Sequence, residues 1–205
     1  MYMNLEIGYL PKKYFNRLPS DGDYPFYFSK NVKYALNIGP MYYPDIPDEQ
    51  LVLFKESLSS YPFYYLFELR HEDEIYPEIH QNLIATEIVL EKVCQCPTNE
   101  FFLVTINNRE QLLQFLPCMF WQHNFNMSTL WSNNKHAFIF EEKTWEYNEI
   151  RDTVCLKFDQ PTSIFWLGHD FMGTDIFSNE EKFSSIEQTI HLLPDFITIE
   201  IVEFE

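Results

Sequence analysis

Hydrophobic residues recur every three or four positions in four segments of the chain, which is the spacing of a helix with one buried face. The clearest segment holds Leu51, Phe54 and Leu58 and ends before a proline at position 62. Asp45 and Asp48 both precede it and have side chains suited to capping a helix. Helices are therefore predicted from Asp45 or Asp48 to residue 58, and over 79–93, 107–117 and 178–193.

Other segments alternate apolar and polar residues, or form short runs of aromatic and β-branched residues, as strands do. The runs 63–69 and 101–106 show this most clearly, whereas the first 46 residues give the weakest signal. Strands are predicted over 2–10, 24–28, 63–69, 101–106, 127–131, 136–140, 153–158, 162–167 and 196–204. Polar turns at 132–135 and 159–161 predict that the strands beside each turn pair as hairpins.

This mixture of helices and strands indicates an α+β fold. We expect one domain over 1–205, with a mixed or mostly antiparallel sheet flanked by about four helices. A weak division near residue 97 is the alternative. A chain of 205 residues buries roughly 70% of its unfolded surface, so its core needs no disulfide or metal.

The charge of the chain narrows the classes of partner. Asp and Glu number 31 against 14 Lys and Arg, a formal net charge of −17. Because 46% of the residues are hydrophobic, the chain can build a core, and the charge is expected on a folded surface. Such a surface repels nucleic acid and anionic membranes and attracts basic proteins. We therefore predict a basic protein partner, and neither a nucleic-acid nor a membrane ligand; the sequence does not indicate the oligomeric state.

Cysteine usage and the absence of targeting features predict a cytoplasmic location. No apolar run approaches the length of about 18 residues that a membrane-spanning helix needs. The chain begins without a basic segment followed by an apolar one, so no signal peptide is expected. All four cysteines are predicted to be reduced thiols. Cys94 and Cys96 stand closer than the usual zinc-knuckle pair, so the sequence predicts no metal and no cofactor.

One cluster carries side chains that could serve acid–base or metal chemistry. His169, Asp170 and Asp175 lie between a predicted strand and a predicted helix, flanked by two glycines. We favour the plainer interpretation, a tight connection in which glycines turn the chain and an aspartate caps the helix. No nucleophile elbow, phosphate-binding loop or dinucleotide fingerprint occurs either. The prediction is that the protein is not an enzyme, with a site at these three residues as the alternative.

Two segments combine carboxylates in a way that suits a protein-binding surface. The loop 71–78 is acidic, and the segment 141–149 interleaves glutamates with aromatic residues. Predicted partner-binding residues are Glu72, Asp73, Glu74, Glu78, Glu141, Glu142, Trp145, Glu146 and Glu149. Aromatic side chains dominate interface energetics and flanking charge speeds encounter. The alternative is that Trp145 and Tyr147 pack inward while the glutamates are solvated.

These features together predict an inhibitor that occludes the active site of a basic, nuclease-type toxin or enzyme. In overall profile alone, without a matching motif, the chain resembles the small acidic immunity proteins that bacteria pair with secreted nuclease toxins. A phage-encoded protein that mimics nucleic acid and disarms a host nuclease follows the same physical logic. Two further alternatives are an enzyme of unrecognised class, using His169, Asp170 and Asp175, and an adaptor whose acidity serves solubility alone.

Overall fold

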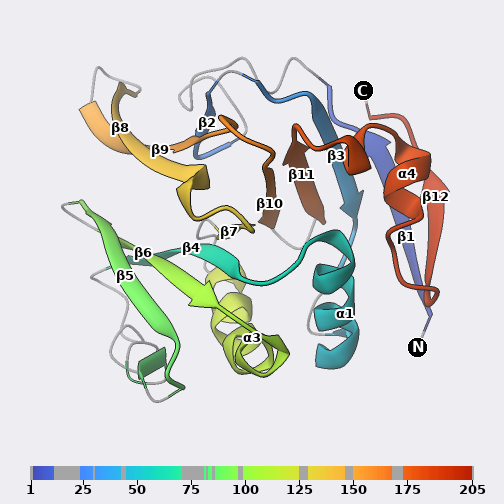
Figure 1. Ribbon diagram of the computed structural model, residues 1–205, viewed down its shortest axis with the longest axis horizontal. Coiled ribbons are helices and arrows are strands. Elements are labelled where there is room, and N and C mark those ends of the chain that lie inside the picture. Colours follow the sequence, from blue (N-terminus) through green and yellow to red (C-terminus); the bar gives the residue numbers. More distant parts are fainter. Residues whose placement is uncertain are drawn as a thin grey trace.

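Two β-sheets pack face to face, and helices cover the outer face of the larger one (Figure 1). This arrangement is seen in a computed structural model of the chain. The structure describes residues 2–11, 24–29, 31–42, 45–70, 81, 83–84, 86–96, 99–124, 129–145, 150–167 and 173–204.

The larger sheet has nine strands in the spatial order β12-β1-β3-β11-β10-β7-β4-β6-β5. Their bounds are β1 Met3–Tyr9, β3 Tyr34–Gly39, β4 Phe63–Arg70, β5 Val89–Gln95, β6 Asn99–Ile106, β7 Thr129–Ser132, β10 Ser163–Leu167, β11 Thr174–Ser178 and β12 Ile197–Ile201. Neighbouring strands are antiparallel except β1 and β12, which run parallel. The edge strands β5 and β12 therefore lie at opposite ends of the molecule, as Figure 1 shows.

The smaller sheet has three strands in the order β2-β9-β8. Their bounds are β2 Tyr27–Phe28, β8 Phe138–Thr144 and β9 Ile150–Leu156. Strands β8 and β9 form an antiparallel hairpin, and β2 adds to β9 in parallel. In the described residues the α-helices are α1 Asp48–Leu58, α3 Arg109–Asn124 and the short α4 Ile186–Ile190, and they lie on the other side of the larger sheet (Figure 1).

Because both faces of the larger sheet are covered, its central strands are buried on both sides. Every residue of β7, β10 and β11 is buried, although side chains alternate between the faces. On β7, Trp131 packs with the helix-side core while Leu130 packs between the sheets. Phe165 and Trp166 divide in the same way on β10. The apolar runs in the sequence reflect this burial on two sides.

The predicted fold class is wrong in its proportions. We expected an α+β domain with about four flanking helices, but the described chain is mostly sheet, with twelve strands and three α-helices. The structure still mixes helix and strand. The predicted single domain over 1–205, and the alternative division near residue 97, stay predictions.

Two of the predicted helices, 79–93 and 178–193, each span more than one element of the structure, although their apolar residues keep a helical spacing throughout. In the segment 79–93, residues 81, 83 and 84 are helical, but the chain then turns and continues as β5. Glu87 occupies the turn with φ of 56°, a left-handed conformation that ends a helix. The segment 178–193 divides into the end of β11, a 3-10 helix Glu181–Phe183 and α4, which the side chain of Ser185 caps.

The helix expected to stop at Pro117 instead continues to Asn124 as α3, with the proline inside it. Both predicted hairpins are also wrong. The segment 132–135 does not turn β7 back onto β8; it carries the chain from the larger sheet to the smaller one. The segment 159–161 likewise carries it back from β9 to β10. A polar turn marks a change of direction, but it does not say which sheet the next strand joins.

Candidate functional site

The end of the β8–β9 hairpin holds the predicted partner-binding residues that the structure describes: Glu141, Glu142 and Trp145. The others, Glu72, Asp73, Glu74, Glu78, Glu146 and Glu149, lie outside the described residues. On β8, Phe138 and Phe140 face the larger sheet. By alternation, Glu142 continues that inner row, whereas Glu141 and Trp145 stand on the outer side of the hairpin.

Trp145 is held on the outer side by β9. Its indole Nε1 donates a hydrogen bond to Thr153 Oγ1 at 2.7 Å, and the Arg151 guanidinium lies 5.6 Å from its ring centroid. Thr153 belongs to the face of the hairpin turned away from the larger sheet and is itself buried, so the Trp145 indole is partly buried on that face; the alternative that Trp145 and Tyr147 pack inward stays open, because Tyr147 lies outside the described residues. The indole is therefore held in one position while part of its surface remains exposed.

Glu141 is largely compensated by its neighbours. It accepts a hydrogen bond from the Tyr27 hydroxyl and pairs with the Lys143 ammonium at 3.1 Å. Both contacts hold the pKa of the Glu141 carboxyl below its usual range, with the Tyr27 bond the larger cause. Burial raises the pKa of the Tyr27 phenol, and the nearby Cys155 and Glu141 raise it further. Glu141 therefore links Tyr27 and Lys143 on this face of the hairpin, and its negative charge is largely balanced by Lys143.

Glu142 has no such compensation among the described residues. It stands in register with Asp152 across the hairpin, and both side chains are exposed. Like charges directly opposite each other on neighbouring strands destabilise a sheet. In the part of the chain that the structure describes, no basic side chain pairs with Glu142. The inner side of the hairpin end is therefore a local concentration of negative charge.

Most basic side chains are already used in ion pairs. Among the described residues, Lys33, Lys92, Arg109, Lys135, Lys143, Lys157 and Lys182 each contact at least one carboxylate. Lys55 is fully buried and does not reach the surface. With a net charge of −17, the surplus carboxylates therefore project an uncompensated negative potential.

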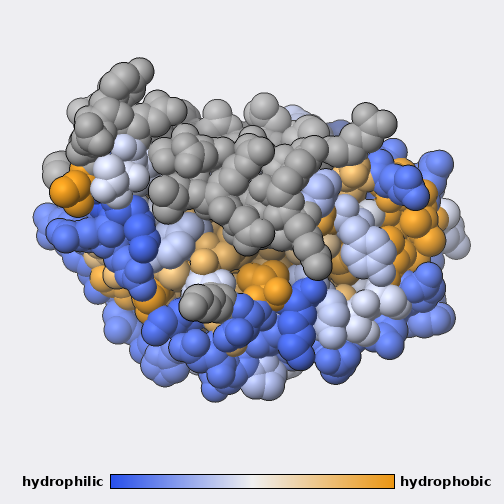
Figure 2. Space-filling view, turned by 90° about the horizontal axis from the view of Figure 1, so that it is seen from above, coloured by the Kyte–Doolittle hydropathy of each residue, from blue (hydrophilic) through white to orange (hydrophobic). Residues whose placement is uncertain are grey.

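The other predicted acidic clusters are placed elsewhere. Glu180 and Glu181 contact Lys182 and Lys33. Glu200 stands in register with Glu6 on β12 and β1, at the opposite end of the larger sheet from β5. Figure 2 shows hydrophobic residues exposed at this β12 end, and further hydrophobic residues among hydrophilic ones at the opposite end of the view. Among the described residues, the acidic clusters thus do not gather on one face, and the hairpin end combines carboxylates with an ordered tryptophan.

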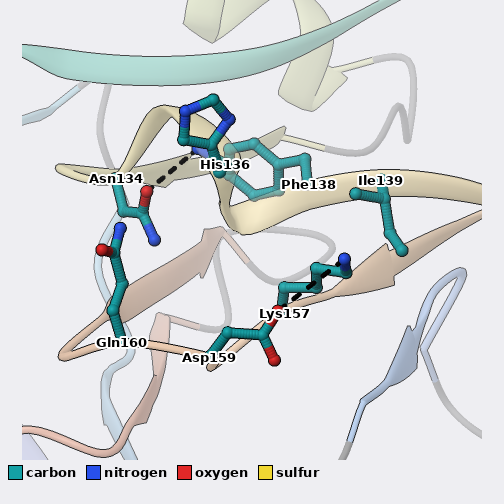
Figure 3. Close-up of a pocket in the computed structure, with 7 residues that line it drawn as sticks. All are labelled: Asn134, His136, Phe138, Ile139, Lys157, Asp159 and Gln160. Carbon is teal, nitrogen blue, oxygen red and sulfur yellow. Dashed lines mark hydrogen bonds and ion pairs between the residues drawn. The ribbon is translucent and has the colours of Figure 1, made fainter.

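A shallow hollow of about 430 Å³ lies at the other end of β8 (Figure 3). Its lining residues are Asn134, His136, Phe138, Ile139, Lys157, Asp159 and Gln160. The Asn134 side chain accepts a hydrogen bond from the His136 backbone N–H at 3.0 Å, and Lys157 lies 3.7 Å from Asp159. These contacts fix the crossover from β7 and the end of β9. The residues that line the hollow offer polar groups for binding, but they include no nucleophile paired with a base.

The predicted catalytic cluster is only partly described, because His169 and Asp170 lie outside the described residues. Asp175 is 6% exposed on β11 and accepts hydrogen bonds from Tyr24 at 2.9 Å and Asn37 at 2.6 Å. Burial raises the pKa of its carboxyl to about 6, although both hydrogen bonds act in the opposite direction. The aspartate expected to cap a helix is not Asp175, because Asp175 lies within strand β11, and Asp170 is outside the described residues.

We expect Asp175→Asn to change how stability depends on pH. The raised pKa means that the folded state holds a proton that the unfolded state releases between about pH 4 and 6. The free energy of unfolding should therefore fall as the pH rises through this range. The substitution should flatten that slope in urea titrations, and an unchanged slope would show that Asp175 does not cause it.

Sequence reasoning missed one cluster at the inner side of the hairpin end. Cys94 and Cys96 Sγ lie 3.9 Å apart, and one carboxylate oxygen of Asp152 completes a group whose atoms lie within 4.8 Å of one another. Burial raises the pKa of the Cys94 thiol to about 12, and the adjacent Cys96 adds to this. A Cys-x-Cys spacing is too short for a knuckle turn, but on a strand it places both thiols on one face. The signal was present in the sequence.

Comparisons with known proteins give no further guide to this site. No protein-family model matches the chain, and no curated protein or solved structure is significantly similar to it. Among the described helices, none combines the length and apolar character needed to cross a bilayer.

Proposed function

We propose that this protein is an acidic inhibitor of the immunity-protein kind, which binds a basic, nuclease-type toxin or enzyme and occludes its active site. The observation that carries the proposal is the use of basic side chains: seven of those described pair with carboxylates, Lys55 is buried and Arg151 lies over the Trp145 ring, so the surplus acids face solvent. A nucleic-acid-handling groove is positively charged, so the two surfaces are complementary.

The end of the β8–β9 hairpin is the proposed contact. Trp145 supplies an aromatic anchor whose position is fixed by Thr153. Glu142 supplies carboxylate charge that no described basic residue neutralises. Its like-charged neighbour Asp152 costs stability in the free protein, and a cationic partner relieves that repulsion. We place the protein in the cytoplasm, a location that its four free thiols support.

Association kinetics test this proposal. Purified basic deoxyribonucleases and ribonucleases are immobilised, and the association rate of the full chain is measured over increasing salt. We expect at least one of them to bind with a rate that falls steeply as salt screens the charges. Failure of every nuclease to bind at low salt would overturn the proposal.

Variants locate the contact. Trp145→Ala should weaken binding by about thirtyfold, the effect of losing a hot-spot residue worth about 2 kcal/mol. Glu142→Lys should slow association strongly, whereas Glu200→Lys, the same charge change on β12, should do so far less. If the two lysine variants weakened binding equally, general charge and not the hairpin would be responsible. Circular dichroism confirms that each variant is folded.

A further inference from the structure

Cys94, Cys96 and Asp152 come together from elements of both sheets. Cys94 lies on β5, the edge strand of the larger sheet, and Cys96 follows directly after its end. Asp152 lies on β9 of the smaller sheet. The three side chains therefore meet in the space between the two sheets. No backbone hydrogen bonds join β5 to β9 there, because the two strands belong to different sheets.

The separation of the two sulfurs fits a tetrahedral metal site. Their Sγ atoms are 3.9 Å apart, too far for a disulfide bond. Around a zinc ion with Zn–S bonds of about 2.3 Å and tetrahedral angles, two thiolate sulfurs lie roughly 3.8 Å apart. The Asp152 carboxylate is within 4.8 Å of both sulfurs, so a small movement of this exposed side chain brings it to bonding distance.

The local strand geometry explains why both thiols point the same way. The register of β5 with β6 shifts between Lys92 and Cys94, which is a β-bulge. Bulges re-aim the side chains that follow them. After the bulge, Cys94 stands opposite Phe101 of β6, whose ring packs 5.0 Å from Phe140 of the smaller sheet. Cys94 thus faces the inter-sheet space.

Another carboxylate lies on the same side. Glu68 of β4 also stands opposite Phe101, so Glu68, Phe101 and Cys94 form one row across three neighbouring strands. The Glu68 charge is close enough to act on the Cys96 thiol. Three protein ligands at Cys94, Cys96 and Asp152 leave the fourth position to Glu68 or to a water molecule.

We propose that Cys94, Cys96 and Asp152 bind one Zn²⁺ ion, which clamps the edge strand β5 to the β8–β9 hairpin. Two thiolates and one carboxylate suit zinc better than the hard cations, which prefer oxygen ligands alone. Binding converts both thiols to thiolates and releases their two protons to solvent, with no change of oxidation state. The inference shares Asp152 with the proposed contact, but it is argued from the geometry of the three side chains and its test does not depend on nuclease binding.

Cobalt titration of the full chain under reducing conditions tests the site. We expect one Co²⁺ per chain, with thiolate-to-cobalt charge-transfer absorption and the visible bands of a tetrahedral site, and displacement by Zn²⁺. Cys94→Ser and Cys96→Ser should abolish the charge-transfer band. Asp152→Asn should weaken binding at least about tenfold, since even outer-shell partners of metal ligands cost that much.

Matched variants control for charge and for thiols in general. Glu141→Gln removes a carboxylate from the outer side of the neighbouring strand, and Cys155→Ala removes a thiol from the outer side of β9. Both should bind cobalt as the unmodified chain does. Zinc should also raise the melting temperature of the unmodified chain and of both controls, and leave Asp152→Asn less affected.

Two results would overturn the site. One is the absence of a charge-transfer band in the unmodified chain at saturating cobalt. The other is a band that survives in both Cys94→Ser and Cys96→Ser. If a serine variant fails to fold, the exposed Asp152→Asn variant, compared with Glu141→Gln, still decides the question through its cobalt affinity.

Discussion

Replacing Trp131 with alanine is expected to destabilise the protein by about 4 kcal/mol, near the upper range for single core substitutions. Trp131 is fully buried on the central strand β7. Its ring stacks on Phe165 with centroids 3.9 Å apart and also contacts Phe63 and Tyr65. Alanine would remove these contacts and leave a cavity that strands fixed on both sides cannot fill.

Thermal and urea unfolding measure this effect. For a chain of this size the loss corresponds to a fall in melting temperature of roughly 10 °C. Tyr2→Ala is the control, because that aromatic ring is 80% exposed and should contribute less than about 0.5 kcal/mol. If Trp131→Ala unfolded at the same urea concentration as Tyr2→Ala, the stacked cluster would not be the centre of the core.

Trp131→Phe refines the same prediction. The buried Trp131 Nε1 has no hydrogen-bond partner among the described residues, and such a donor costs about 1–3 kcal/mol. Phenylalanine keeps a ring against Phe165 and removes that donor. We therefore expect a much smaller loss than for alanine.

Replacing Lys55 with methionine is expected to stabilise the protein, and most strongly at low pH. Lys55 lies on α1 with its side chain fully buried, and its ammonium is 5.0 Å from the Trp131 ring centroid. Burial lowers the pKa of this ammonium from 10.5 to about 7. Burial therefore makes the charged form of Lys55 costly in the folded state, and methionine removes that cost.

The sign of the pH dependence follows from the lowered pKa. Between about pH 7 and 10.5 the unfolded state binds a proton at Lys55 that the folded state has lost. The free energy of unfolding should therefore rise as the pH increases through this window, and the Lys55 contribution should be constant below it. Methionine keeps the length of the side chain without the charge, so Lys55→Met should remove this rise.

Urea unfolding at about pH 6 and about pH 10 tests the prediction. Lys33→Met is the matched control, because the Lys33 side chain is 57% exposed in its pair with Glu181. It should leave both the stability and its pH dependence almost unchanged. If the free energy of unfolding of Lys55→Met rose with pH as much as that of the unmodified chain, Lys55 would not be the cause of the rise.

The elements with the strongest local pattern could be predicted from the sequence. Helix α1 ends at residue 58 as expected, and strands β4 and β6 lie where the aromatic runs indicated. In these segments, propensity, periodicity and burial favour the same structure. The short α4 could not be predicted at its true length, since Phe183 and Ile186 are buried at helical spacing although the helix begins only at residue 186.

The sequence carried less information about how the elements pair. Strands β7 and β10 are neighbours in the larger sheet, although the whole β8–β9 hairpin separates them along the chain. The neighbour that a strand pairs with depends on which apolar surface the strand covers. A strand that is apolar on both faces carries no sequence pattern that identifies this neighbour. The same limit applies to Asp152, whose approach to Cys94 depends on the packing of one sheet on the other.

Inhibition of a nuclease tests the central claim most directly. The full chain is added in increasing amounts to a basic nuclease that it binds, and the rate of nucleic-acid cleavage is measured. We predict that cleavage falls to zero near one chain per nuclease, and that a Trp145→Ala, Glu142→Lys double variant fails to inhibit at the same ratio. Cleavage that continues unchanged with every nuclease tested, or that the double variant stops equally well, would contradict the proposed function.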